Sequence, residues 1–166
     1  MRRRSRRGVE RAPGARIGRG VVLAARGGGR IVLGATAVVG DRCELRAAPG
    51  ATIVVDGTLD DGCRLVAREA ITVEAGARLG PECVVLDADP VDDDAERPIR
   101  EQGHRSAPVR LAADVLLGPR VAVLRGVTVG AGATVLAHSV CTRDVPPGAE
   151  VAGTPAQRVG AAPARL

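Results

Sequence analysis

Aliphatic residues recur at every sixth position near the C-terminal end of the chain, at Leu111, Leu117, Val123, Val129 and Val135. Four residues after each comes a second, mostly small or β-branched residue, in the order Val115, Val121, Val127, Ala133 and Ser139. A repeat of six fits neither the helical period of about 3.6 residues nor the strand period of two. A chain that turns a corner every six residues does fit, because three short strands then form a triangular coil that pairs with the coils above and below. The pattern therefore predicts an all-β fold, a parallel β-helix of hexapeptide repeats.

The N-terminal half repeats at every twentieth position instead of every eighteenth. The aligned sets are Leu45, Leu65 and Val85, then Ile53 and Val73, then Leu59 and Leu79. A coil of three hexads with a two-residue bulge accounts for this longer period. The pairs Pro49-Gly50 and Ala75-Gly76 suit the corners of such a coil, because glycine tolerates tight turns.

Three cysteines share one position of this longer repeat, namely Cys43, Cys63 and Cys83. They are predicted to fill the small inward position that Val, Ala and Ser occupy in later coils, and Cys141 falls on the six-residue ladder. No CxxC pair or neighbouring histidine accompanies them, so no metal site is expected. We expect all four thiols to be reduced, as in a cytoplasmic protein.

The net charge of +5 comes from the N-terminus, where residues 2–7 carry five arginines and no acid. We predict a disordered basic tail over residues 1–14. The chain has no aromatic residue with which to stack a base, so no specific nucleic-acid partner is expected. No apolar run approaches the roughly 18 residues of a membrane span, and no secretory signal pattern follows the arginines. A cytoplasmic location without membrane contact is therefore predicted.

The remaining chain is predicted to form one β-helix domain over residues 15–160, with a C-terminal tail at 161–166. The repeat breaks once, from Asp87 to about Pro108, where an acidic run is followed by basic residues. No six-residue register survives there, so this segment is predicted to be a loop ejected from the prism. Loops of this length inside compact repeats are often functional.

Four segments in the last third of the chain carry a family resemblance: Ala107–Leu111, Val123–Gly130, Val140–Gly148 and Val151–Ala156. They resemble the C-terminal half of the hexapeptide-repeat acyltransferases, the left-handed parallel β-helix enzymes that include maltose, galactoside and other sugar O-acetyltransferases. Within these segments the Thr-Arg-Asp-Val-Pro-Pro-Gly and Ala-Gly-Thr-Pro-Ala sequences are more specific than the hexads. The resemblance covers about a third of the chain closely.

The resemblance implies a homotrimer with three active sites in the grooves between neighbouring prisms. Acetyl-CoA or another acyl-CoA would be the donor, and a hydroxyl or amine of a small molecule or sugar the acceptor. By the same resemblance, the positions that would contact coenzyme A are Ala137, Thr142, Arg143, Thr154, Pro155 and Arg158. Arginine can pair with a phosphate, and small residues let the pantetheine arm approach the backbone.

The chain departs from the family at the expected catalytic histidine. In many relatives the ejected loop opens with Asp-x-Asp-x-His, and the histidine acts as general base because imidazole titrates near working pH. Here the stretch runs from Asp87 to Val91, with valine where the histidine is expected. The candidates to replace it are His104 in the same loop, His138 beside the coenzyme positions, and Asp89, whose carboxylate would need burial to act as a base.

Three functions remain open from the sequence. The first is an acyl-CoA-dependent O- or N-acyltransferase whose base has moved. The second is a catalytically degenerate trimeric scaffold that binds a ligand or partner, which the loss of the histidine at Val91 favours. The third is an enzyme of different chemistry in the same groove, for example one that acts on an already deprotonated amine.

Overall fold

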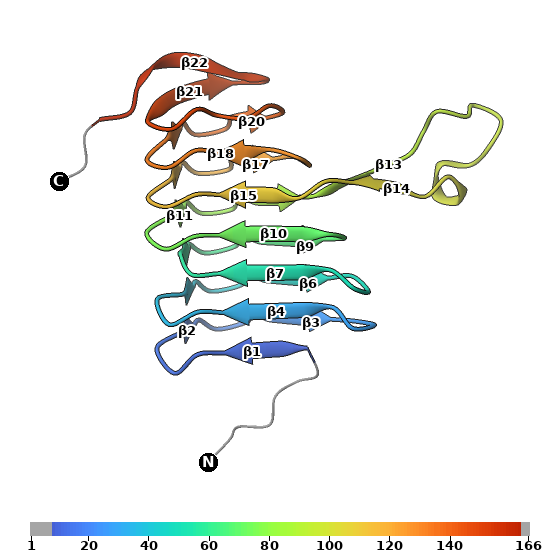
Figure 1. The fold of residues 1–166 in the computed structure, drawn as a ribbon, viewed down its shortest axis with the longest axis horizontal. Helices are drawn as coiled ribbons and strands as arrows, with labels where there is room; N and C mark the ends of the chain where they lie inside the picture. The colour runs from blue at the N-terminus through green and yellow to red at the C-terminus, as the bar shows by residue number, and fades with distance from the viewer. Residues whose placement is uncertain (1–7, 164–166) are drawn as a thin grey trace.

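The chain folds into a triangular prism whose coils stack from the N-terminus to the C-terminus (Figure 1). The structure is a computed structural model and describes residues 8–163. Face A contains β1 (Val9–Arg11), β4 (Arg30–Leu33), β7 (Thr52–Val55), β10 (Ala70–Val73), β15 (Val109–Leu111) and β18 (Thr128–Val129). Face B contains β2 (Arg16–Ile17), β5 (Val38–Val39), β8 (Thr58–Leu59), β11 (Arg78–Leu79), β16 (Leu116–Leu117), β19 (Thr134–Val135), β21 (Ala149–Gly153) and β22 (Ala156–Ala161). Face C contains β3 (Val22–Ala25), β6 (Glu44–Ala47), β9 (Arg64–Ala67), β12 (Val84–Leu86), β17 (Ala122–Val123) and β20 (Val140–Cys141).

The six-residue ladder is the inward column of the C-terminal coils. Leu111 pairs with Val129, Leu117 with Val135, and Val123 with Cys141, each partner lying three hexads further along the chain. All six side chains are at most 1% exposed. The predicted left-handed parallel β-helix of hexapeptide repeats is therefore confirmed.

The repeat of twenty residues predicted for the N-terminal half is confirmed by the aligned residues of faces B and C, but it is wrong on face A. Leu45 pairs with Leu65, as predicted, but Ile53 pairs with Ile71 rather than with Val73. In the coil over residues 52–69, the strands on faces A and C have four residues each. The two corners that flank face A, at 56–57 and 68–69, have only two residues each. The longer strands and the shorter corners cancel, so along face A this coil keeps the shorter period of three hexads.

The corner between faces B and C (the B–C corner) is a column of left-handed residues. Its members are Gly20, Arg42, Gly62, Glu82, Arg120 and His138, with φ between +57° and +73°. From Arg42 onward, each backbone N–H in this column donates to a carbonyl of the preceding coil's corner at 2.8–2.9 Å. The stacked turn thus satisfies its own polar groups, which stabilises a backbone conformation that costs an L-residue about 1–2 kcal/mol.

The three aligned cysteines lie just after this corner and point into the prism, as predicted. Cys43, Cys63 and Cys83 donate their thiols to the carbonyls of Asp60, Gly80 and Gly118 at 3.1–3.2 Å. Contacts with the thiols above and below, together with burial, raise the pKa of Cys63, and burial raises the pKa of Cys141 to about 11.

The segment from Asp87 to Pro108 leaves the prism as an arm at the corner between faces C and A (the C–A corner; Figure 1). The predicted ejected loop is an antiparallel hairpin of β13 (Ala88–Pro90) and β14 (His104–Ser106), with a short 3-10 helix, η1 (Ile99–Glu101), in its outer part. The absence of a six-residue register concealed these strands, because they pair with each other and not with the coils.

Both ends of the solenoid differ from the predicted boundaries. The first coil begins with β1 at Val9, so residues 9–14, assigned to the basic tail, belong to the solenoid; residues 1–7 lie outside the described part. At the other end β22 folds back antiparallel on β21 and extends to Ala161. No helix in residues 8–163 is long and apolar enough to cross a membrane.

The buried thiol of Cys141 predicts a loss of stability at alkaline pH. The folded pKa of Cys141 lies above its ordinary value of 9.0, so its contribution is complete below about pH 9 and is lost as the pH rises through about 11. A shift of this size corresponds to roughly 2–3 kcal/mol. The chain has no lysine or tyrosine, so cysteines are the only side chains that titrate in this range.

Denaturant unfolding of the parent and of Cys141→Val at about pH 7 and pH 11 measures this effect. Valine is the residue below Cys141 in the same column, so the variant should be close to the parent at neutral pH and lose less stability at alkaline pH. Equal losses in the two proteins would contradict the assignment.

Candidate functional site

The base of the hairpin is anchored by Asp87, which is fully buried. One carboxylate oxygen accepts the N–H of Arg68 at 2.7 Å and the other that of Glu69 at 2.8 Å. The carbonyl of Asp87 accepts the N–H of Ala107 at 2.9 Å, which closes the hairpin. Because both oxygens are engaged by backbone donors of the coil below, Asp87 holds the arm in place and has no free oxygen for a substrate.

Asp89, a predicted catalytic candidate, forms an ion pair with Arg125 of the next coil. The distance from Arg125 Nε to Asp89 Oδ2 is 2.6 Å, and both side chains are about 40% exposed. In the same corner the N–H of Gly126 donates to the carbonyl of Ala107 at 3.0 Å. The arm is therefore fixed from below by Asp87 and from above by Arg125 and Gly126.

His104 and Val91 lie on opposite faces of the hairpin. In the register of β13 and β14, Asp89 lies opposite Arg105 and Pro90 opposite His104. Side chains alternate along a strand, so Asp89 and Val91 lie on one face of the hairpin, whereas Pro90 and its partner His104 lie on the other. Asp89 reaches up to the C-terminal coils, so the exposed His104 faces away from them.

His138 lies at the B–C corner, away from the hairpin. It is exposed, and its φ is +61°, in the left-handed region. Its N–H donates to the carbonyl of Pro119 at 2.9 Å, in line with the other members of the corner column. Glycine adopts this conformation without strain, so imidazole at this position is accommodated at a cost in backbone energy.

Two of the predicted coenzyme residues, Thr142 and Arg143, follow β20 at the C–A corner, and both are exposed. Val123 and Cys141 are paired in register, and Arg125 and Arg143 each come two residues later. Arg143 therefore lies one coil above Arg125, the residue that holds the hairpin. Arg125 is neutralised by Asp89, whereas Arg143 forms no hydrogen bond or ion pair with any residue in the range 8–163. A free guanidinium is therefore presented at this corner.

The other predicted coenzyme residues gather elsewhere. Ala137 is at the B–C corner, and Thr154 and Pro155 form the turn between β21 and β22. The N–H of Gly153 donates to the hydroxyl of Ser139 at 3.0 Å, which places this turn beside His138. Arg158 lies in β22, exposed and opposite Val151. The predicted residues thus form two groups, separated by the width of face C.

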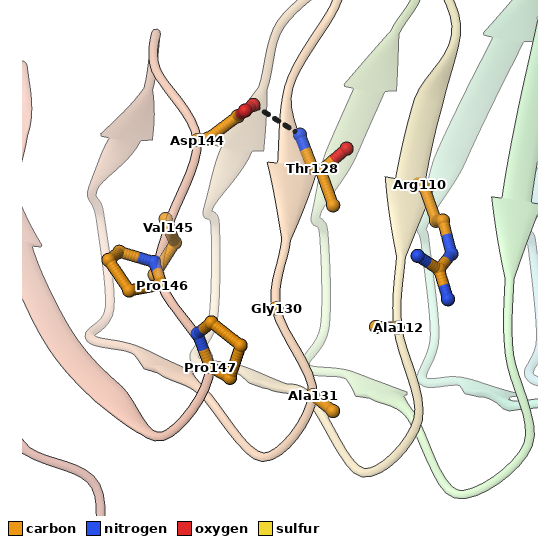
Figure 2. A pocket seen from close by; sticks show the side chains of 9 residues that line it. All are labelled: Arg110, Ala112, Thr128, Gly130, Ala131, Asp144, Val145, Pro146 and Pro147. Atoms are coloured by element: carbon orange, nitrogen blue, oxygen red, sulfur yellow. Dashed lines mark hydrogen bonds between the residues drawn. The ribbon is translucent and has the colours of Figure 1, made fainter.

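A groove of about 400 Å³ crosses face A (Figure 2), from Asp144 at the C–A corner to Gly130, Ala131, Pro146 and Pro147 at the corner between faces A and B. Arg110 lies on one side, Pro146 and Pro147 lie on the other, and small residues such as Gly130 and Ala131 lie between them. None of the predicted site residues lines it. The sequence did contain a signal for the groove. In the Thr-Arg-Asp-Val-Pro-Pro-Gly sequence, the four residues after Arg143 all line it.

The charged groups of the groove are held by neighbours. Arg110 Nε lies 2.6 Å from Glu74 Oε1, and Asp144 accepts the N–H of Thr128 at 2.8 Å. The groove is therefore a mostly apolar surface of small residues, and Arg143 directly precedes its lining residue Asp144 in the chain. No group of three or more His, Cys, Asp or Glu side chains in the described chain converges as metal ligands would.

Curated proteins with similar sequences are acetyltransferases. The chain is 38% identical over 77 residues to a probable acetyltransferase of Mycobacterium tuberculosis, which covers 46% of this chain and 26% of that protein. It is 52% identical over 52 residues to a 2,3,4,5-tetrahydropyridine-2,6-dicarboxylate N-acetyltransferase of Staphylococcus aureus, covering 31% and 22%. The chain thus spans about a quarter of the length of these relatives, and no family model matches it.

Solved structures of acyltransferases superpose on most of this chain. An N-acyltransferase from Bacillus cereus, AntD, in complex with dTDP and coenzyme A, superposes with a TM-score of 0.77 at 18% identity, over 93% of this chain and 83% of that one. A hexapeptide-repeat acetyltransferase from Vibrio cholerae, in complex with acetyl-CoA, has a TM-score of 0.58 at 23% identity, over 90% and 72%. The predicted similarity to the hexapeptide-repeat acyltransferases is confirmed.

The anchoring role of Asp87 predicts a local loss of stability in Asp87→Asn. An amide in this place points an N–H₂ group at a backbone donor, so one hydrogen bond is lost and one donor is left unsatisfied, at a cost of about 2 kcal/mol. Hydrogen exchange of the hairpin peptides should accelerate, and urea unfolding should shift to lower concentration.

The matched control is Asp41→Asn. Asp41 also accepts a backbone N–H, that of Arg19 at 2.7 Å, but at an exposed corner where water can replace it. Hairpin exchange that is the same in both variants would show that Asp87 does not hold the arm.

Proposed function

We propose that this chain is an acyl-CoA-dependent acyltransferase that transfers an acyl group, in the first instance acetyl, to a hydroxyl or amine of a small molecule. The observation that carries the proposal is the unpaired Arg143, at the corner where the arm leaves a solenoid of acetyltransferase type. The crystallised relatives described above hold acetyl-CoA in one case and coenzyme A in the other, which supports acyl-CoA as the donor.

The chemistry of the groove suits such a donor. A guanidinium binds a phosphate through paired, charge-assisted hydrogen bonds, which is the role proposed for Arg143. Gly130 and Ala131 leave the backbone accessible to the amide groups of a pantetheine arm, and Pro146 and Pro147 offer an apolar wall. The remaining proposed contacts are those of Ala137, Thr142, Thr154, Pro155 and Arg158.

In the proposed reaction the acceptor oxygen or nitrogen attacks the thioester carbonyl and displaces the thiolate of coenzyme A. A base takes the proton of the acceptor, and the thiolate is protonated as it leaves. His104 and His138 are the candidates, because Asp89 is engaged by Arg125. A sugar or another small molecule with a hydroxyl or amine is the proposed kind of acceptor. The Staphylococcus relative is named for N-acetylation of a tetrahydropyridine dicarboxylate, which supports a small-molecule acceptor.

We also propose a cyclic homotrimer in which the site is completed by a neighbouring copy. The two groups of predicted coenzyme residues flank face C, and neither is complete alone. The outward side chains of face C in the C-terminal half are apolar and half-buried, namely Val84, Leu86, Ala122, Leu124 and Val140. Packing this strip on the next prism would bury it and bring the two groups together. A cytoplasmic location stays a prediction.

One observation favours the alternative of a catalytically degenerate scaffold. Val91 occupies the position where relatives place the base, on the hairpin face that reaches the C-terminal coils. His104 is on the other face, so within one chain no imidazole replaces it from the arm.

Calorimetric titration with acetyl-CoA and with free coenzyme A tests the binding step. Arg143→Ala should weaken binding by roughly tenfold or more, because a charge-assisted phosphate contact is lost. The matched control is Arg16→Ala, which removes an equally exposed arginine at the far end of the prism. An absence of binding in the parent would refute the acyl-CoA proposal.

Turnover is measured as release of coenzyme A thiol with a panel of amines and alcohols, for the parent, His104→Ala, His138→Gly and Val91→His. Glycine is used at position 138 because it accepts the positive φ. Loss of the true base should lower the rate on the order of 10²–10⁴-fold, and Val91→His should raise it. A parent that binds coenzyme A but turns over no acceptor, even with Val91→His, would favour the scaffold.

A further inference from the structure

The first coil carries a charge in a column that is otherwise apolar. Arg11 of β1 pairs in register with Leu33 of β4. The column continues through Val55, Val73, Leu111 and Val129, and every one of these side chains is at most 1% exposed. Arg11, which is exposed, thus occupies an inward position in the first coil that the structure describes, where each later coil has an aliphatic residue.

The guanidinium of Arg11 takes the place of the backbone donor that the later coils receive at this corner. At the corner between faces A and B, the carbonyls of Ala37, Gly57, Ala77, Val115 and Ala133 each accept an N–H from the coil below at 2.8–3.0 Å. The corresponding carbonyl of the first coil is that of Ala15. It accepts hydrogen bonds from Nε and Nη2 of Arg11 instead, at 3.2 and 2.6 Å.

The end that Arg11 covers would otherwise suit another coil. Its apolar layer is only partly buried and consists of Val9, Ile17, Val21, Leu23 and Ala25. Strand edges over an apolar layer are templates for joining a second chain, and inward-pointing charges are one way in which proteins block this. At the opposite end β22 covers β21 by antiparallel pairing, so the edge of face B is closed there by backbone.

We infer that Arg11 closes the N-terminal end of the solenoid and prevents two copies of this chain from joining through their first coils. A second copy stacked on this end would trap the guanidinium between two apolar layers, which is costly, and would displace it from the carbonyl of Ala15. The inference does not depend on the proposed acyltransferase activity.

The test compares the mass in solution of the full-length parent with those of Arg11→Leu and Arg16→Leu, by light scattering coupled to size exclusion over a series of concentrations. Arg11→Leu completes the apolar column and frees the carbonyl of Ala15, so its mass should double, or grow further, as concentration rises. Arg16 lies in the same coil but at an outward position, because its Cα partner is the outward Val38, so Arg16→Leu should keep the parent mass.

Two further variants keep the inference falsifiable if Arg11→Leu is insoluble. Arg11→Glu retains a charge in the column but cannot donate to Ala15, and should keep the parent mass with faster hydrogen exchange in β1. Arg11→Gln is neutral and should associate at higher concentration. Parent mass for folded Arg11→Gln and, where soluble, folded Arg11→Leu would overturn the inference, as would equal association in Arg16→Leu.

Discussion

Every part of this molecule depends on the register in which one coil hydrogen-bonds to the next. Because the backbone of each coil is satisfied only by its neighbours, a side chain has the same environment as the residue one coil away. This is why aliphatic residues, thiols and left-handed turns each form continuous columns. It is also why a residue that departs from its column is informative, as Arg11 is in the first described coil.

The hexads predicted the prism because, in the C-terminal coils, six residues make one side of the triangle and nothing is inserted. Prediction failed where two local changes cancelled, as between Ile53 and Val73, since longer strands and shorter corners leave no trace in a simple period. The hairpin strands were missed for a similar reason. Their pairing partner is each other, and that pairing carries no repeat.

The candidate site was harder to predict than the fold. The sequence identified Arg143, but its lack of a partner could be known only once Asp89 was seen to engage Arg125 below it. Asp87 and Asp89 cannot be distinguished from the sequence. In the structure Asp87 is buried and anchors the hairpin, whereas Asp89 forms an ion pair with Arg125 at the surface. The two groups of predicted coenzyme residues are close in sequence but lie on different edges of the prism, which no spacing rule for a single chain reveals.

The hairpin also affects how the solenoid forms. Most paired parallel strands are separated by the chain of a single coil. The three pairs that enclose the hairpin are separated by a coil and the whole hairpin, namely β10 with β15, β11 with β16 and β12 with β17. The loop that closes there is about twice as long as the others, and each doubling costs about 0.6 kcal/mol of chain entropy. If the solenoid forms coil by coil, pairing across the hairpin therefore has the largest loop-closure cost. The two halves on either side of the hairpin are expected to form first, and the pairing between them last.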